Sequence, residues 1–200
     1  MTGPTNKKLA SPVDLPALTA RGARLLKEVG GSFALIGGVA LQAYGHERYT
    51  KDVDFAVREA QGAAAQAAWK GETKPLRIGG VSLVTDVAPI DLIDRRVELR
   101  ALYEEAIDAT QRSGFTIEAA GEQVPVVPIE YLVAMKLAAP RAQDEADLAF
   151  LLKRRELDYV RARQIVRQHL GFGVLRFLDR LAREAGRKDA PRDYDEDEEE

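Results

Sequence analysis

Two aspartates with one valine between them, Asp52 and Asp54, stand in the otherwise apolar segment DVDFAV. In a strand, residues i and i+2 point to the same face, so we expect these carboxylates to lie side by side. Two adjacent like charges raise each other's pKa unless a cation neutralises them. Mg²⁺ is a hard cation that takes oxygen ligands of this kind. The pair therefore predicts a magnesium site.

A third carboxylate would complete such a site. The segment APIDLID (88–94) contains Asp91 between two apolar residues, on a strand that could neighbour the first. Asp86 and Asp94 are weaker candidates because they lie nearer the strand ends. We predict Asp91 as the third acid, with the other two as alternatives.

A glycine pair, Gly37 and Gly38, stands upstream between a short apolar run and a helical pattern. A turn from strand to helix exposes backbone N–H groups that bind phosphate, and glycine lets the phosphate come close. A triphosphate on this turn, with metal ions on the aspartates, is the layout of nucleotidyl transfer by a two-metal site. Each pattern alone is more often structural, but their order along the chain favours this function.

Composition narrows the class of protein. The 200 residues are 46% hydrophobic and 30% charged, which is typical of a globular chain with one domain or two small ones. The absence of cysteine excludes disulfides and thiolate metal sites, and His46 and His169 have no zinc-type spacing. No signal-peptide core or membrane-length apolar run occurs, so we expect a cytoplasmic protein.

Periodicity predicts an α+β (α/β) fold in which helices flank a mixed β-sheet and a helical bundle follows. Helices are expected at 15–30, 38–45, 59–69 and 97–110, with strands at 32–37, at 53–57 and within 76–94, and a hairpin turning at Ala120–Gly121. Beyond Pro128 the pattern is almost wholly helical, with helices expected at 129–139, 142–155, 158–170 and 173–186.

These elements predict a flexible leader (1–13), an α/β domain (14–127), a helical domain (128–187) and a disordered acidic tail (188–200). The net charge is −3, and the tail segment 193–200 carries seven acidic residues, so the rest of the chain sums to about +4. The basic helices at 153–188 form either a solvated face or a surface that attracts RNA or another polyanion.

The segment LIGGVALQAYGHERYTKDVDFAV (35–57) resembles the signature of the DNA polymerase β-like nucleotidyltransferase superfamily. That signature is an apolar residue, a glycine pair, a spacer and Asp-apolar-Asp-apolar. The form GHERYTKDVD (45–54) is similar to bacterial minimal nucleotidyltransferases, above all the AbiEii-type toxins of abortive-infection systems. The segment 127–152, a helix with Lys136 followed by Arg and Asp residues, supports the likeness.

The resemblance implies roles for particular residues. Asp52, Asp54 and Asp91 would be catalytic and would hold two Mg²⁺ ions, with Asp91 helping to deprotonate the acceptor. The implied nucleotide-binding residues are Gly37, Gly38, Arg48, Thr50, Lys136 and Asp144. Other readings stay open: Lys136 as a surface lysine, and Asp144 as an acid at a helix N-terminus, paired with Arg141.

We therefore predict a nucleotidyltransferase that moves NMP from an NTP to a hydroxyl of RNA, such as a tRNA end, or of a protein. It could be the toxin of a toxin–antitoxin pair, with a cognate antitoxin as partner. The alternatives are a nucleotide-binding module without turnover and an enzyme that modifies a small molecule such as an antibiotic. The oligomeric state stays open.

Overall fold

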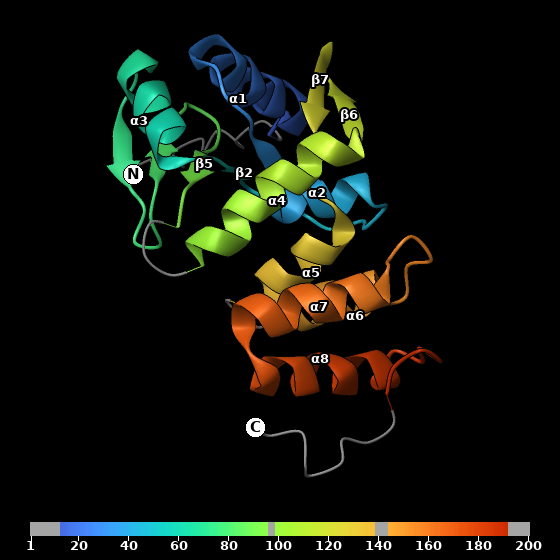
Figure 1. Cartoon of the computed structure of the whole chain (residues 1–200). Helices are drawn as coiled ribbons and strands as arrows, with labels where there is room; N and C mark the ends of the chain where they lie inside the picture. Colours follow the sequence, from blue (N-terminus) through green and yellow to red (C-terminus); the bar gives the residue numbers. More distant parts are fainter. Residues whose placement is uncertain (1–12, 96–98, 139–143, 192–200) are drawn as a thin grey trace, which may run out of the picture.

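The computed structural model describes residues 13–95, 99–138 and 144–191 (Figure 1). Nearly all of the predicted leader, most of the acidic tail and Arg141 lie outside the described residues. No helix in the described part of the chain is both long enough and apolar enough to cross a bilayer.

A mixed sheet of five short strands forms the first layer, in the order β1-β2-β5-β4-β3. Its strands are β1 (Ala34–Ile36), β2 (Val53–Ala56), β3 (Thr73–Pro75), β4 (Val81–Leu83) and β5 (Ile90–Ile93). The central strands β2 and β5 are parallel, whereas the outer pairs are antiparallel. The two strands that carry the predicted acids are therefore direct neighbours.

Four helices surround this sheet: α1 (Leu15–Val29), α2 (Gly37–Ala43), α3 (Glu59–Ala68) and α4 (Arg100–Ser113). Asp14 caps the start of α1, because its Oδ1 accepts a hydrogen bond from the Ala17 amide at 3.0 Å. Gly22 lets α1 approach one face closely, since a Cβ there would lie 2.5 Å from the Phe55 ring and 3.1 Å from Ile90. Helix α4 lies on the other side of the sheet (Figure 1).

The predicted hairpin is confirmed as β6 (Thr116–Ala119) and β7 (Glu122–Pro125). Its two turn residues, Ala120 and Gly121, both have positive φ, as a tight two-residue turn requires. The chain then returns beside β1, where the Val127 amide donates to the Leu35 carbonyl at 3.1 Å. This return delivers the chain to the helical half.

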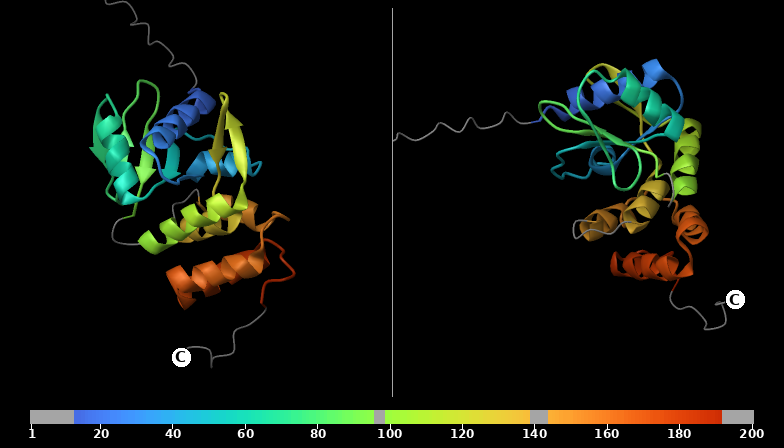
Figure 2. Two further views of the ribbon diagram at one scale, coloured as in Figure 1. Left: turned by 45° about the horizontal axis from the view of Figure 1, so that its top comes forward. Right: turned by 90° about the vertical axis from the view of Figure 1, so that its left-hand side faces the viewer.

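The helical half consists of α5 (Ile129–Ala138), α6 (Asp144–Leu152), α7 (Tyr159–Leu170) and α8 (Phe172–Glu184). These helices lie to one side of the sheet, with α4 between the sheet and α7 (Figures 1 and 2). Buried side chains from the sheet and from α5 to α8 belong to one continuous hydrophobic core. The predicted α+β fold is thus confirmed, while the domain boundary at residue 127 stays a prediction.

Polar contacts also tie the helical half to α4. Glu105 of α4 accepts hydrogen bonds from the Tyr131 hydroxyl at 2.7 Å and from Arg161 at 3.0 Å, and its other oxygen lies 2.8 Å from His169 Nε2. Burial raises the pKa of Glu105, but the bonds from Tyr131 and His169 outweigh it and leave the pKa below its ordinary value. Glu105 therefore links α4 to α5 and α7 as a carboxylate.

Two expectations about elements were inaccurate. The strand β3 was not predicted, because the sequence Thr-Lys-Pro of this mostly exposed edge strand has no apolar alternation. Asp52 was expected within a strand, but β2 begins at Val53, whose amide makes the first bond to the neighbouring segment at Pro89.

Candidate active site

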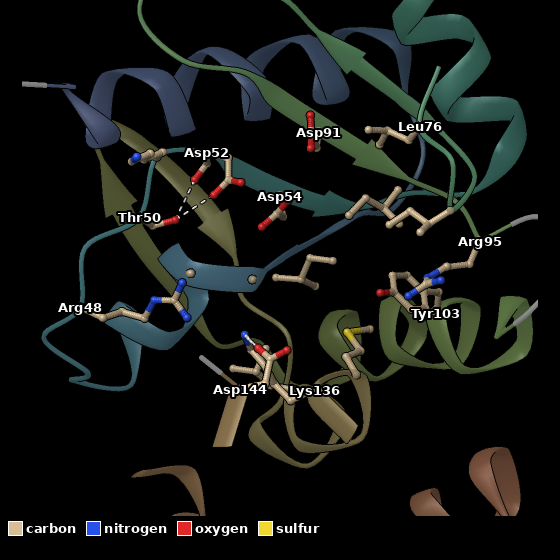
Figure 3. Close-up of a pocket in the computed structure, with 18 of the residues that line it drawn as sticks. Arg48, Thr50, Asp52, Asp54, Leu76, Asp91, Arg95, Tyr103, Lys136 and Asp144 are labelled. Carbon is tan, nitrogen blue, oxygen red and sulfur yellow. Dashed lines mark hydrogen bonds and ion pairs between the residues drawn. The ribbon is translucent and has the colours of Figure 1, made fainter. Parts of the chain in front are cut away.

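A cavity of about 510 Å³ opens between the sheet and helices α4 and α5 (Figure 3). It gathers side chains from both halves of the chain, including all nine residues that the sequence singled out for the site. These are Gly37, Gly38, Arg48, Thr50, Asp52, Asp54, Asp91, Lys136 and Asp144. Their gathering makes this cavity the candidate active site.

Asp54 and Asp91 are paired in register across the parallel strands β2 and β5. Adjacent strands lie about 4.8 Å apart, so the two side chains leave the sheet as close neighbours. Side chains alternate along a strand, and Phe55 and Ile90 face α1 while these aspartates face the cavity. The alternation places the apolar residues in the core and both carboxylates in the site.

Asp91 has an unusual environment for an acid. Burial raises its pKa, and the nearby charge of Asp52 raises it further, against a hydrogen bond from Ser82 that lowers it. Within the described part of the chain, the buried atom Asp91 Oδ1 has no hydrogen-bond partner. A buried acceptor without a partner is costly unless a ligand satisfies it. Asp91 Oδ1 is therefore an acceptor that a proton or a bound cation would satisfy.

Asp52 is positioned by a side chain rather than by the sheet. The hydroxyl of the buried Thr50 donates to Asp52 Oδ1 at 2.9 Å, as Figure 3 shows. Thr50 therefore orients a site carboxylate, and its predicted contact with the nucleotide stays a prediction. The hydrogen bond leaves the second carboxylate oxygen of Asp52 available to a ligand.

The carboxylates provide oxygen donors for a divalent cation. Among residues 13–95, 99–138 and 144–191, no three acidic or histidine side chains already stand in a metal-holding arrangement. The three aspartates line one cavity, however, and Asp91 Oδ1 is an unsatisfied buried oxygen. In its chemistry the donor set therefore fits a hard cation, which takes carboxylate oxygens as ligands.

Gly37 and Gly38 pack too closely against residues of the site for either position to carry a side chain. A Cβ on Gly37 would lie 1.9 Å from Asp54 Oδ2, and one on Gly38 would lie 2.4 Å from Thr50 Oγ1. Gly37 also has a φ of +65°, which side chains disfavour. These glycines therefore let the turn pass beside two residues of the site, and their predicted contact with phosphate stays a prediction.

A cluster of ion pairs lies on the side of the cavity formed by α5 and α6. Lys136 Nζ donates to Asp144 Oδ1 at 2.6 Å and to Asp147 Oδ2 at 2.7 Å. Asp147 also pairs with Arg48 and lies 3.2 Å from His46 Nε2. The Lys136 side chain is only 14% exposed, so its reading as a surface lysine is wrong.

Sequence reasoning missed Asp147, which joins three basic side chains. The available signal was its spacing from Asp144, because residues three apart at a helix start share one face. It also missed Arg95 and Tyr103, which line the far end of the cavity. Of the three acids considered for the third position, Asp91 alone lines this cavity, whereas Asp86 is exposed on a loop and Asp94 is buried elsewhere.

Comparison with known proteins points to one family. A family model described as "Nucleotidyl transferase AbiEii toxin, Type IV TA system" matches residues 23–198. No curated protein sequence matched the chain.

Solved structures agree on the fold. An antigenic nucleotidyltransferase-like protein from Paracoccidioides brasiliensis superposes with a TM-score of 0.51 at 15% identity, over 82% of this chain and 92% of that chain. Two further structures superpose less well. The antibiotic-resistance factor ANT(2'')-Ia has a TM-score of 0.45 at 15% identity, over 86% of this chain and 94% of that chain. JHP933 from Helicobacter pylori has a TM-score of 0.40 at 16% identity, over 88% of this chain and 90% of that chain. The Paracoccidioides brasiliensis structure shows that the chain has a nucleotidyltransferase fold.

Proposed function

Because the chain belongs to the AbiEii nucleotidyl transferase toxin family, we propose that it is a Mg²⁺-dependent enzyme that transfers NMP from an NTP to a hydroxyl group. In this reaction the acceptor oxygen forms a bond to the α-phosphorus, the bond to the bridging oxygen breaks, and pyrophosphate leaves. The hydroxyl proton must go to a base in the site.

The observation that carries this proposal is the register pairing of Asp54 with Asp91 beside Asp52 in one cavity. These three carboxylates would hold the divalent cations, which when bound neutralise triphosphate charge and make the acceptor hydroxyl more acidic. Asp91 would take the proton, because it lies in register beside Asp54 and its buried Oδ1 has no hydrogen-bond partner in the described part of the chain.

The remaining residues would bind the nucleotide. Lys136 and Arg48 bring positive charge to the cavity, and both are held in place by Asp147. Lys136 would exchange part of its pairing with Asp144 for a phosphate oxygen, which makes Asp144 a positioning residue. Gly37 and Gly38 also line the cavity, and because neither has a side chain, their backbone would contact the phosphates.

The toxin role is a further part of the proposal, which the description of the matching family supports. We propose that expression of the active protein halts growth and that a cognate antitoxin relieves it. RNA and protein both remain acceptors to be tested. The arginines of α7 and of the segment after α8 favour RNA only weakly, because Arg163 is paired with Asp179 and Arg187 with Asp189.

An incubation of the full chain with each α-³²P-labelled NTP, Mg²⁺ and total cellular RNA or protein tests the function. We expect one labelled acceptor band that depends on Mg²⁺ and is lost in EDTA. NTP binding without label on any RNA, protein or small-molecule fraction would instead identify a nucleotide-binding module without turnover.

A further inference from the structure

The cavity extends beyond the carboxylates to an end formed by Arg95 and Tyr103. Figure 3 shows these two residues on the side away from Arg48, with Asp54 and Asp91 lying between the two ends. None of the roles proposed above uses Arg95 or Tyr103, although both line the cavity.

Arg95 has an unfavourable backbone conformation and an unfavourable side-chain environment. Its backbone has a φ of +46°, in the left-handed region that non-glycine residues rarely occupy. The residue is only 8% exposed, and its Nε has no hydrogen-bond partner in the described part of the chain. Its guanidinium carbon lies 5.6 Å from the centre of the Tyr103 ring. Strained backbone and an unsatisfied buried donor together point to a ligand that Arg95 binds.

Apolar and aromatic side chains form much of the cavity wall. They include Tyr103 and Met135, and also Leu76 and Ile78 on the β3–β4 turn, which carries Arg77 between them.

The turn that carries Leu76 and Ile78 is held tightly to the sheet. Gly80 has a φ of +104°, and a Cβ there would lie 2.0 Å from the Leu92 carbonyl oxygen. The Leu76 amide also bonds the Gly80 carbonyl at 3.1 Å. The apolar wall is therefore fixed by the backbone before any ligand arrives.

We infer that Arg95 and Tyr103 form the subsite for the nucleobase of the NTP. A flat base offers two apolar faces to these walls and hydrogen-bond acceptors on its edge to the guanidinium. This inference rests on the proposed function, because the triphosphate beside the carboxylates would tether the base at this end.

The donor character of Arg95 selects among bases. A guanidinium only donates, so it favours bases with a carbonyl oxygen on the accessible edge, namely guanine, cytosine and uracil. Adenine places an amino group, itself a donor, beside its ring acceptors. The subsite should therefore bind GTP, CTP or UTP more tightly than ATP.

Calorimetric titration of the full chain with each NTP and with tripolyphosphate, all with Mg²⁺, tests the subsite. Tripolyphosphate has no base, so it reports the phosphate site alone. We expect Arg95→Met to weaken binding of the preferred NTP about tenfold or more and to leave tripolyphosphate affinity unchanged. The variant Arg95→Lys keeps the charge and a hydrogen-bond donor but loses the planar fork, so it should weaken binding of the preferred NTP less than Arg95→Met does.

The matched control is Arg21→Met, because Arg21 also lies over an aromatic ring, that of Trp69 at 4.3 Å, but not in the cavity. It should bind every ligand as the wild type does, and thermal melts establish that each variant is folded. Unchanged NTP affinities in a folded Arg95→Met protein would overturn the subsite while the proposed function stands. A wild type that binds neither NTP nor tripolyphosphate would overturn both.

Discussion

Asp54 and Asp91 are register partners on two adjacent parallel strands, and their carboxylates face the same cavity. The strands that carry them are held by apolar residues on the opposite face, where Phe55 packs against α1 at Gly22. The sheet thus fixes two acids side by side although they are distant in sequence. Nucleotide transfer at this cavity should therefore depend on both carboxylates.

Replacing either acid by its amide should abolish transfer but not folding. Asp54→Asn or Asp91→Asn keeps the side-chain shape and removes a charge that the cations require, so we expect turnover to fall at least about a hundredfold. Label transfer from NTP measures it. The matched control, Asp86→Asn on an exposed loop, should keep wild-type turnover. Equal activity in Asp54→Asn and Asp86→Asn would contradict the assigned site.

Gly37→Ala should distort the site through a steric clash and a strained backbone. The new Cβ would push against Asp54 Oδ2, and the φ of +65° would be strained, at a cost of about 1–2 kcal/mol in unfolding free energy. We expect weaker nucleotide binding and lower turnover together, measured by titration and label transfer. Gly173→Ala in α8 is the control, since nothing lies within 4 Å of its added Cβ. A fully active Gly37→Ala enzyme would show that the close contact is unimportant.

Asp147→Asn should destabilise the protein more than an ordinary surface change. It removes the charge shared by Lys136, Arg48 and His46, although Lys136 keeps its pair with Asp144, so we expect a loss of about 1.5–3 kcal/mol in unfolding free energy. Urea unfolding measures this loss. The exposed neighbour Glu145→Gln is the control and should change the unfolding free energy by no more than about 0.5 kcal/mol. Equal stability of the two variants would disprove a central role for Asp147.

The pH dependence of stability should reveal the Glu105 network. The pKa of Glu105 is lowered below its ordinary value of 4.5 in the folded state, so its contribution to stability is present above about pH 4.5 and is lost as pH falls through the lowered value. The difference in unfolding free energy between wild type and Glu105→Gln should therefore shrink on acidification.

Chemical denaturation from pH 7 to pH 3 measures that difference. Glu104→Gln on the same helix is the control, because the pair that Glu104 makes with Arg100 at 2.9 Å is exposed. If the Glu105→Gln difference stays constant across this range, the network does not hold the carboxylate as described.

The sequence allowed much of the fold and the core of the site to be predicted. Short-range patterns marked the helices, the hairpin turn and the aspartates, because helical periodicity and glycine turns are local properties. The assignment of Asp91 over Asp86 and Asp94 stayed open until strand pairing placed it opposite Asp54. A register between strands cannot be read from one strand alone.

What the sequence did not reveal depends on contacts between distant segments. Asp147 resembles any acid near a helix start until Arg48 and Lys136 meet it. Arg95 resembles one member of a charged pair at a strand end until its side chain is found buried over Tyr103. Asp147 acquires its role where α6 meets α5 and the loop before β2, and Arg95 acquires its role where the segment after β5 meets α4.

The most direct measurement of the central claim compares NTP labelled at the α-phosphate with NTP labelled at the γ-phosphate, in wild type and Asp54→Asn. Nucleotidyl transfer at the Asp54–Asp91 cavity predicts that label reaches the acceptor only from the α position and only with the wild type. Transfer of the γ label, or transfer of the α label by a folded Asp54→Asn protein, would contradict the account.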